Sequence, residues 1–244
     1  MSQRCALVTG ASRGIGGEIA RRLAGQGYDL MLVARRNDSL ETFAAEIRAD
    51  YDVRTHHVAA DLSAEGNVRR VAHEHRAVYD RLDLLVLNAG LGNYAPITES
   101  TLKSYDLTFN LNVRSAYILL QELLPLLRST ASSNPDHGAK VIALASIAGV
   151  HPEAGLAAYG ASKSALISLC ETVTLEECDN GITATALSPG FVDTDMTAWI
   201  DGPRSAMIKT ADVAELVMAV SRLSANAAVG NIVIARHGAE PRRP

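Results

Sequence analysis

The fold is decided by the stretch Thr9-Gly10-Ala11-Ser12-Arg13-Gly14-Ile15-Gly16, which follows a short apolar run at Cys5–Val8 and opens a helix-like pattern. Gly10 permits a tight turn, while Gly14 and Gly16 let the main chain approach a pyrophosphate and let the helix pack on a sheet. Free N–H groups at the start of such a helix bind phosphate. A glycine-rich turn alone is a weak signal, but its place directly after a first strand predicts a dinucleotide-binding fold.

Short apolar runs alternate with helix-like stretches along the rest of the chain. Several runs, such as Leu84–Leu87, are apolar at every position, which is typical of strands buried on both faces of a sheet. The alternation predicts one α/β domain over residues 1–244, a Rossmann-like, doubly wound parallel sheet of about seven strands with helices on both faces. The expected strands are Cys5–Val8, Asp29–Ala34, Val53–Ala59, Leu82–Leu87, Lys140–Ala145, Thr183–Leu187 and Asn231–Ala235. The expected helices are Ile15–Gly25, Ser39–Asp50, Ala64–Tyr79, Ser104–Arg128, Leu156–Cys178 and Ala211–Ser224.

Single residues indicate where several of these elements begin or end. Ser39, Ser63 and Thr210 stand where helix N-caps are expected. We expect Pro125 to kink or end the long helix that contains it. The segment Ser129–Gly138 is rich in residues that favour turns, so it is predicted to be a surface loop.

Composition and charge exclude several classes of protein. The chain has 244 residues, of which 48% are hydrophobic, and a formal net charge of −4, which argues against a nucleic-acid partner. No apolar stretch approaches the length of about 18 residues that a membrane-spanning helix needs. Three cysteines without close pairing favour a reducing, cytoplasmic location over a disulfide framework. The spacing of the histidines predicts no metal site.

The end of the second expected strand bears on the choice of cofactor. Ala34, Arg35 and Arg36 stand where a fold that prefers NAD places a carboxylate for the ribose hydroxyls. A carboxylate would repel a 2′-phosphate, whereas a guanidinium binds it through paired hydrogen bonds. Arg13, inside the glycine loop, can reach the same phosphate. The pattern predicts NADP(H) rather than NAD(H), with Arg35 favoured over Arg36; the alternative is that both are solvated surface charges.

A second group of residues has the composition of a catalytic site. Tyr159 and Lys163 are four residues apart in a helix-like stretch, so they share one helix face. Ser146 follows the expected strand Lys140–Ala145, and ligands bind at the carboxyl edge of such sheets. A tyrosine and lysine at this spacing are common by themselves. Combined with the glycine loop and a serine at a strand end, they predict a catalytic constellation.

In this order along the chain, the motifs resemble those of the short-chain dehydrogenase/reductase family in its short, single-domain form. The resemblance covers nearly the whole length and extends to Asn88-Ala89-Gly90 and to Ser188–Thr194. It implies the catalytic residues Asn112, Ser146, Tyr159 and Lys163. The residues expected to contact the cofactor are Thr9, Gly10, Ser12, Arg13, Gly14, Ile15, Gly16, Arg35, Arg36, Asp61, Leu62, Asn88, Ala89, Gly90, Tyr159, Lys163, Pro189, Gly190, Val192 and Thr194.

The chemistry follows from the residue types. When hydride reaches a carbonyl carbon, the oxygen must gain a proton, and a free tyrosine with a pKa of about 10 is a poor acid at neutral pH. We expect the Lys163 ammonium to lower that pKa, so that Tyr159 acts as general acid in reduction and general base in oxidation. Ser146 would stabilise the charge that develops on the oxygen. The resemblance adds that Lys163 holds the nicotinamide ribose, that Thr194 binds the carboxamide and that Asn112 supports a chain of waters.

For three of the implied residues the sequence leaves an alternative open. Asn88 can stabilise the turn after its strand instead of contacting the cofactor directly. Asp61, which with Leu62 resembles the adenine contact of the family, can instead help to cap the helix that follows. Asn110 is a near rival of Asn112, which we favour because the Asn-Val-x-Ser-Ala spacing resembles the family pattern.

The C-terminal part departs from the family pattern. Many members end with an Asp-Gly-Gly turn after a strand, whereas this chain has Ile234-Ala235-Arg236-His237-Gly238-Ala239, unlike the carrier-protein reductases that often carry that ending. Residues 191–210 correspond to a substrate lid, in which Met196, Trp199 and Ile200 either line the pocket or anchor the lid. Residues 236–244 form a polar C-terminal tail.

The sequence thus predicts an NADP(H)-dependent oxidoreductase that interconverts a ketone or aldehyde and a secondary alcohol by hydride transfer. The alternatives are a 3-oxoacyl thioester reductase of the same class and a non-catalytic nicotinamide-binding sensor, although sensors usually lose the Tyr or Lys that this chain keeps. Related epimerases and dehydratases carry a second domain, for which 244 residues leave little room. The expected partners are a small-molecule carbonyl or alcohol and further copies of the chain, as a tetramer or dimer, with neither nucleic acid nor a membrane. Apolar residues that exceed one stripe on the helices at 104–128 and 156–178 support the oligomer.

Overall fold

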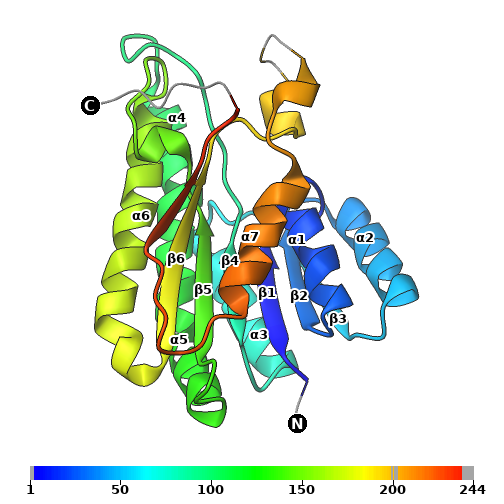
Figure 1. The fold of residues 1–244 in the computed structure, drawn as a ribbon. Helices are drawn as coiled ribbons and strands as arrows, with labels where there is room; N and C mark the ends of the chain where they lie inside the picture. Colours follow the sequence, from blue (N-terminus) through cyan, green and yellow to red (C-terminus); the bar gives the residue numbers. More distant parts are fainter. Residues whose placement is uncertain (1–2, 199, 201–202, 238–244) are drawn as a thin grey trace.

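Seven parallel strands form a single sheet in the computed structural model, which describes residues 3–198, 200 and 203–237. Their order in space is β3-β2-β1-β4-β5-β6-β7 (Figure 1). Every residue of β1, β2, β4, β5 and β6 is buried, as expected for strands covered on both faces. The strands are β1 (Cys5–Thr9), β2 (Asp29–Ala34), β3 (Thr55–Ala59), β4 (Leu84–Leu87), β5 (Ala139–Leu144), β6 (Ile182–Pro189) and β7 (Asn231–Ile234).

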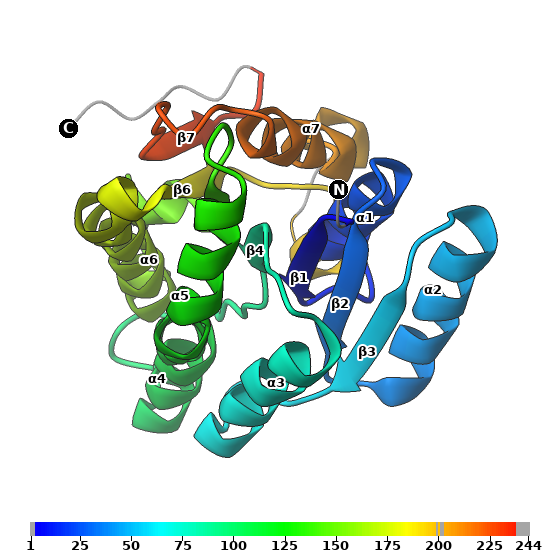
Figure 2. The ribbon, with the colours of Figure 1, turned by 90° about the horizontal axis from the view of Figure 1, so that it is seen from below.

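Helices cover both faces of this sheet, as the two views show (Figures 1 and 2). Helices α1, α2 and α7 bury their apolar sides on one face, and α3, α5 and α6 on the other. The helices are α1 (Gly14–Gly25), α2 (Asn37–Asp50), α3 (Glu65–Val78), α4 (Leu102–Phe109), α5 (Ser115–Ser133), α6 (Ala157–Glu177) and α7 (Thr210–Ser221). The predicted doubly wound α/β fold is therefore confirmed. Among the described residues, none of the helices combines the length and the hydropathy needed to cross a bilayer.

The strand order reverses at β1, which pairs with β2 on one side and with β4 on the other. In doubly wound sheets the ligand binds at such a switch point, outside the carboxyl ends of the strands. The glycine loop leaves β1 at this edge, Asn88 follows β4, and Ser146 follows the end of β5. The topology thus brings the sequence motifs to one edge of the sheet.

The expected helix starts need small corrections. In α7 the Asp212 carboxylate accepts a hydrogen bond from the main-chain N–H of Lys209 at 3.0 Å, so a side chain within the first turn occupies that end of the helix. The N-caps are Arg36, Ala64 and Lys209, in place of the expected Ser39, Ser63 and Thr210.

The helix expected at Ser104–Arg128 differs most from the prediction. It consists of α4 and α5, which are joined by a π-helical turn at Asn110–Arg114. Pro125 does not end α5, which continues to Ser133 and so includes the first part of the loop expected at 129–138. A proline removes one main-chain hydrogen bond, but the fully buried Leu123 and Leu127 hold the helix against the core on either side of it.

Candidate active site

The glycine loop has the conformation that its sequence requires. Gly10 and Gly14 have positive φ angles of 66° and 57°, which residues with a side chain rarely adopt. A Cβ atom on Gly16 would lie 2.3 Å from the Gly10 carbonyl oxygen, so glycine is needed for the helix to approach the loop. Helix α1 begins at Gly14, which brings the N–H groups of its first turn to the carboxyl edge of the sheet, where they can bind a phosphate.

Thr9 and Asn88 fasten the ends of β1 and β4 to each other. The Thr9 hydroxyl donates to the Val86 carbonyl at 3.2 Å and accepts from the N–H groups of Asn88 and Ala89, both at 2.9 Å. The Asn88 side-chain amide donates to the carbonyl oxygens of Thr9 at 2.9 Å and Gly10 at 3.2 Å. Asn88 therefore holds the first residues of the glycine loop through its side-chain amide, which agrees with a turn-stabilising role.

The residues expected at the adenosine end follow β2 and β3. Arg36 borders an open hollow of about 720 Å³ that also includes Ser12 of the glycine loop. Hydrogen bonds from the Ser63 N–H at 3.0 Å and hydroxyl at 2.8 Å lower the pKa of Asp61, and the charge of Arg35 lowers it further. Asp61 thus stabilises the turn before α3 and, within the described part of the chain, makes no side-chain cap hydrogen bond to the helix itself, and Arg35 lies near this carboxylate.

Several apolar residues of the expected cofactor set belong to the packed interior. Leu62 is buried, and Ile15 and Ala89 are partly buried against the core. Gly190, just after β6, donates its N–H to the Ile234 carbonyl of β7 at 2.8 Å. The side chains of Leu62, Ile15 and Ala89 therefore pack in the interior, and the Gly190 N–H joins β6 to β7.

Asn112 lies on the π-helical turn between α4 and α5 and is almost fully buried. Its side-chain oxygen accepts from the Leu91 N–H, and its side-chain nitrogen donates to the Leu91 carbonyl and the Ser162 hydroxyl, all at 2.9 Å. A π turn widens a helix by one residue and is frequent at functional sites. Asn112 therefore joins the loop after β4 to α6 and is the asparagine that this turn buries.

Ser146, Tyr159 and Lys163 meet beyond the carboxyl end of β5. The Ser146 hydroxyl accepts from the Ala148 N–H at 3.2 Å, and it lies near enough to Tyr159 to act on the pKa of that phenol. The Lys163 nitrogen lies 5.6 Å from the centre of the Tyr159 ring and donates to the Leu144 carbonyl at 2.6 Å. The three side chains that the sequence predicted as a catalytic group are thus close together in space.

The loop after β4 completes this group. A Cβ atom on Gly90 would lie 3.2 Å from Asn112 Oδ1 and 3.3 Å from Lys163 Nζ. A Cβ atom on Gly92 would lie 3.1 Å from the Tyr159 ring. The loop therefore passes tightly along the catalytic side chains. Gly92 cannot be predicted as part of the site from the sequence, because its contact with Tyr159, far along the chain, leaves no local signal.

Burial governs the protonation of the catalytic group. It lowers the pKa of Lys163 to about 8 and raises that of Tyr159, while the Ser146 hydroxyl opposes the rise. The sequence predicts a pKa of Tyr159 that is lowered by the Lys163 ammonium, whereas the overall shift in this structure is upward. The physical reason is that burial disfavours the phenolate, while Lys163 directs its hydrogen bond to the Leu144 carbonyl. A neutral phenol beside Ser146 is the form that can donate a proton.

The segment after β6 returns the chain to the glycine loop. Strand β6 ends at Pro189, and Val192 then forms an isolated parallel bridge with Ile208. The Thr194 methyl carbon would lie 3.5 Å from a Cβ atom on Gly14. Thr194 therefore stands beside the start of α1, at the edge of the sheet where ligands bind in doubly wound folds.

Arg13 pairs with the segment expected to form the lid. Its guanidinium lies 2.6 Å from the Asp195 carboxylate, and the two side chains are 68% and 70% exposed. The sequence predicts Arg13 as a ligand for a 2′-phosphate. In this structure it binds a carboxylate, so binding a phosphate requires Arg13 to exchange one anion for another.

Other expectations concern the lid and the tail. Met196 is half exposed, and Trp199 lies outside the described residues. Residues 238–244 of the polar tail also lie outside them. The Arg236 guanidinium lies over the Phe191 ring, 5.1 Å from its centre, so the start of the tail rests on the start of the segment expected to be the lid.

Comparison with known proteins agrees with the arrangement of these motifs. The family model described as short chain dehydrogenase matches residues 4–203. The chain belongs to this family. A short-chain dehydrogenase relative, the rhamnolipids biosynthesis 3-oxoacyl-[acyl-carrier-protein] reductase of Pseudomonas aeruginosa, is 35% identical over 219 residues, which are 89% of this chain and 83% of that protein. An uncharacterized oxidoreductase of Staphylococcus epidermidis is 29% identical over 218 residues, 89% of this chain and 90% of that protein.

Solved structures of short-chain dehydrogenases share the whole fold. An alcohol dehydrogenase from the archaeon Thermococcus sibiricus, complexed with 5-hydroxy-NADP, has a TM-score of 0.86 and 27% identity, covering 99% of this chain and 98% of that one. A short chain dehydrogenase from Burkholderia cenocepacia, in complex with NADP, has a TM-score of 0.84 and 30% identity, covering 96% of both chains. The predicted family and its oxidoreductase class are confirmed.

Proposed function

We propose that this protein is an NADP(H)-dependent carbonyl reductase that interconverts a ketone or aldehyde and a secondary alcohol. The observation that carries the proposal is the meeting of Ser146, Tyr159 and Lys163 on the edge of the sheet from which the glycine loop also leaves. A dinucleotide that lies across the switch point would reach both the glycine loop and the catalytic group. A non-catalytic sensor has no need of this group.

The catalytic side chains divide the work on the substrate oxygen. The bound nicotinamide supplies the hydride in reduction and accepts it in oxidation. Tyr159, held as a neutral phenol, donates its proton to the substrate oxygen, and Ser146 stabilises the charge that develops there. Lys163, whose pKa of about 8 leaves it mostly protonated at neutral pH, stabilises the phenolate that remains. In oxidation the same groups act in reverse.

Asn112 acts through other groups. Its three hydrogen bonds hold the loop after β4 against α6, and Gly90 of that loop lies beside both Asn112 and Lys163. We infer that Asn112 keeps Lys163 and Tyr159 in register with the cofactor crevice. The water chain that the family resemblance implies would start from this side of Lys163.

Three arginines support NADP(H) over NAD(H). Arg35 and Arg36 follow β2 without an acidic neighbour at Ala34, and Arg13 lies in the glycine loop. A charge-assisted hydrogen bond to a phosphate stabilises the complex by about 1.5–3 kcal/mol, or roughly 10- to 150-fold in affinity. The related structures from Thermococcus sibiricus and Burkholderia cenocepacia, which hold an NADP analogue and NADP, support the same choice.

A 3-oxoacyl thioester is the second candidate substrate. The observation that favours it is the 35% identity with the 3-oxoacyl-[acyl-carrier-protein] reductase of Pseudomonas aeruginosa. The run Ile234–Ala239 lacks the Asp-Gly-Gly ending that many carrier-protein reductases share, which favours a free ketone or aldehyde. The two candidates differ in the group attached to the carbonyl and leave the chemistry of Tyr159 unchanged.

The proposal is tested by following NADPH oxidation against a panel of ketones, aldehydes and 3-oxoacyl thioesters, with NADH in parallel. We expect turnover of at least one compound, with a higher kcat/KM for NADPH than for NADH. Turnover of thioesters alone would select the second candidate. Tight binding of NADPH without turnover across the panel would favour the sensor, and failure to bind NADPH would overturn the proposal.

The proposal extends to the assembly and location of the enzyme. We expect a homo-oligomer, a dimer or tetramer, mainly because related enzymes pair the helices that carry Asn112 and the Tyr159–Lys163 pair. The free thiols of Cys5, Cys170 and Cys178 fit a reducing compartment, so we expect the enzyme in the cytoplasm.

A further inference from the structure

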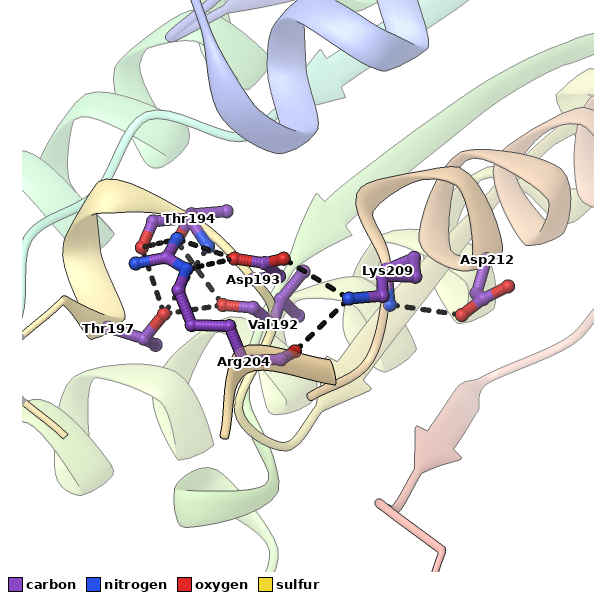
Figure 3. A network of polar contacts seen from close by, with 7 residues as sticks. All are labelled: Val192, Asp193, Thr194, Thr197, Arg204, Lys209 and Asp212. Carbon is purple, nitrogen blue, oxygen red and sulfur yellow. Dashed lines mark hydrogen bonds and ion pairs between the residues drawn. The ribbon is translucent and has the colours of Figure 1, made fainter. Parts of the chain in front are cut away.

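A network of charged side chains joins the two ends of the segment expected to form the substrate lid (Figure 3). Its centre is Asp193, which follows β6 and the bridge residue Val192. Arg204, 11 residues later, donates from Nε to Asp193 Oδ1 at 2.6 Å. Lys209, 16 residues later, donates from Nζ to Asp193 Oδ2 at 3.2 Å. One carboxylate therefore holds both the returning chain and the residue that precedes α7.

Main-chain hydrogen bonds run beside these ion pairs. The Asp193 N–H donates to the Ile208 carbonyl at 2.8 Å, and the Ile208 N–H donates to the Phe191 carbonyl at 3.0 Å. The Lys209 ammonium also donates to the Arg204 carbonyl at 3.1 Å. Main-chain hydrogen bonds and side-chain ion pairs thus both connect the two ends of this segment.

The network acts directly on Thr194. The Arg204 guanidinium that binds Asp193 also donates to the Thr194 carbonyl at 3.2 Å. The Thr197 hydroxyl donates to the Val192 carbonyl at 2.6 Å and accepts from the Thr194 N–H at 3.3 Å. Thr194 is therefore held at both its N–H and its carbonyl, and its side chain stands beside the start of α1.

The charges of the network favour this arrangement at neutral pH. Hydrogen bonds from Lys209 and Arg204 lower the pKa of Asp193, so its carboxylate stays ionised. The Asp193 side chain is 26% exposed, against 49% for each of its two cations. The Asp193 carboxylate is thus less exposed than the Arg204 and Lys209 side chains that bind it.

We propose that Asp193 is a positioning residue for the nicotinamide end of the site. By holding Arg204 and Lys209, it fixes Thr194 against the glycine loop. This inference rests on the proposed function, because the place of Thr194 matters to binding only if a nicotinamide dinucleotide lies across the glycine loop. The network contains neither Tyr159 nor Lys163 of α6. We therefore expect Asp193 to affect the affinity for the nicotinamide half of the cofactor.

The test compares two ligands that share the adenosine end. NADPH extends across the glycine loop to Thr194, whereas 2′,5′-ADP occupies the adenosine end alone. We expect Asp193→Asn to raise the Kd of NADPH by about 5- to 20-fold, between the values typical of exposed and charge-assisted pairs, and to leave the Kd of 2′,5′-ADP within about twofold. Both constants can be measured by calorimetry, with the melting temperature recorded for each variant.

The matched control is Glu122→Gln. Glu122 is a carboxylate on α5 whose side chain is 25% exposed and which also binds two cations, Arg69 and Arg76. If Asp193→Asn does not fold, Arg204→Gln removes the cation that contacts Thr194 and gives the same comparison. Equal loss for both ligands, or no loss for either, would overturn the proposal. Failure of the unmodified protein to bind either ligand would instead reject the proposed function.

Discussion

Arg13 stands between two anions, the Asp195 carboxylate that it binds in the structure and the 2′-phosphate of the proposed cofactor. Both side chains of the pair are largely exposed, so the ion pair stabilises the structure by no more than about 1 kcal/mol. A doubly charged phosphate that also meets Arg35 and Arg36 would displace Asp195. If Arg13 binds the cofactor phosphate as proposed, that phosphate and Asp195 would compete for one guanidinium.

This competition predicts the effect of Asp195→Asn. The variant frees Arg13, so NADPH should bind up to about fivefold more tightly, the equivalent of the lost ion pair. NADH, which has no 2′-phosphate, should bind as before, and it serves as the internal control. Fluorescence titration of both cofactors measures the difference. Unchanged affinity for NADPH, or an equal gain for NADH, would show that Arg13 does not bind the phosphate.

Among the helices, α3 carries a residue whose state should limit stability in acid. His75 is fully buried beside the Tyr79 ring, 5.4 Å between centres, and its Nε2 lies 3.2 Å from the Arg81 carbonyl. Within the described residues its buried Nδ1 atom has no hydrogen-bond partner. Burial lowers the pKa of His75 from 6.5 to about 4, so the folded protein keeps the ring neutral.

The lowered pKa of His75 predicts a loss of stability in acid. Between about pH 6.5 and 4 the unfolded chain binds a proton that the folded protein does not, so the free energy of unfolding falls as the pH falls. At 1.36 kcal/mol per pH unit, this amounts to about 2 kcal/mol between pH 7 and 5. Urea denaturation of the wild type and His75→Leu at both pH values measures it. We expect the variant to lose about that much of the pH dependence; an unchanged dependence would contradict the prediction.

How far the elements can be predicted depends on the physical signal behind each one. The strands that are buried on both faces appear in the sequence as continuous apolar runs, and β2 has the expected bounds, Asp29–Ala34. The π turn at Asn110–Arg114 adds one residue to a helical turn and leaves no trace in the periodicity. Pro125 misleads because the tertiary packing of its neighbours outweighs its local cost.

The candidate site divides in the same way. Ser146, Tyr159 and Lys163 can be predicted because strand ends and helix faces fix their positions. The contacts of Asp193 lie in irregular segments, where the spacing of residues does not determine which way their side chains point. The network that holds Thr194 is therefore seen only in the structure. The sequence predicts a lowered pKa for Tyr159, whereas burial, which depends on the whole fold, raises it.

For the whole molecule, most of the apolar residues that suggested an oligomer are covered by the chain itself. In α5, Leu119, Leu123 and Leu127 are fully buried. The support from the sequence is therefore weaker than expected. Large side chains that remain exposed on α5 and α6 are Tyr117, at 51%, and Leu175, at 81%.

We still predict a dimer or tetramer, formed through an isologous contact of these helices. Light scattering at micromolar concentration measures the mass directly. A mass of two or four times the 25.9 kDa chain is the expected result. In a Tyr117→Glu variant, a charge at the exposed position on α5 should weaken the contact and lower the mass. A mass near 25.9 kDa for the unmodified protein would contradict the prediction.

The central claim is that Tyr159 moves the proton while hydride passes between the cofactor and a carbonyl carbon. The most direct measurement compares Tyr159→Phe with the wild type, with NADPH affinity and turnover determined on the same preparations. The variant keeps the ring that packs beside Gly92 and removes only the hydroxyl. We predict an NADPH affinity within about threefold of the wild type and a turnover reduced by roughly 100- to 10,000-fold, the usual contribution of general acid–base catalysis. Turnover reduced by less than about tenfold would contradict the account.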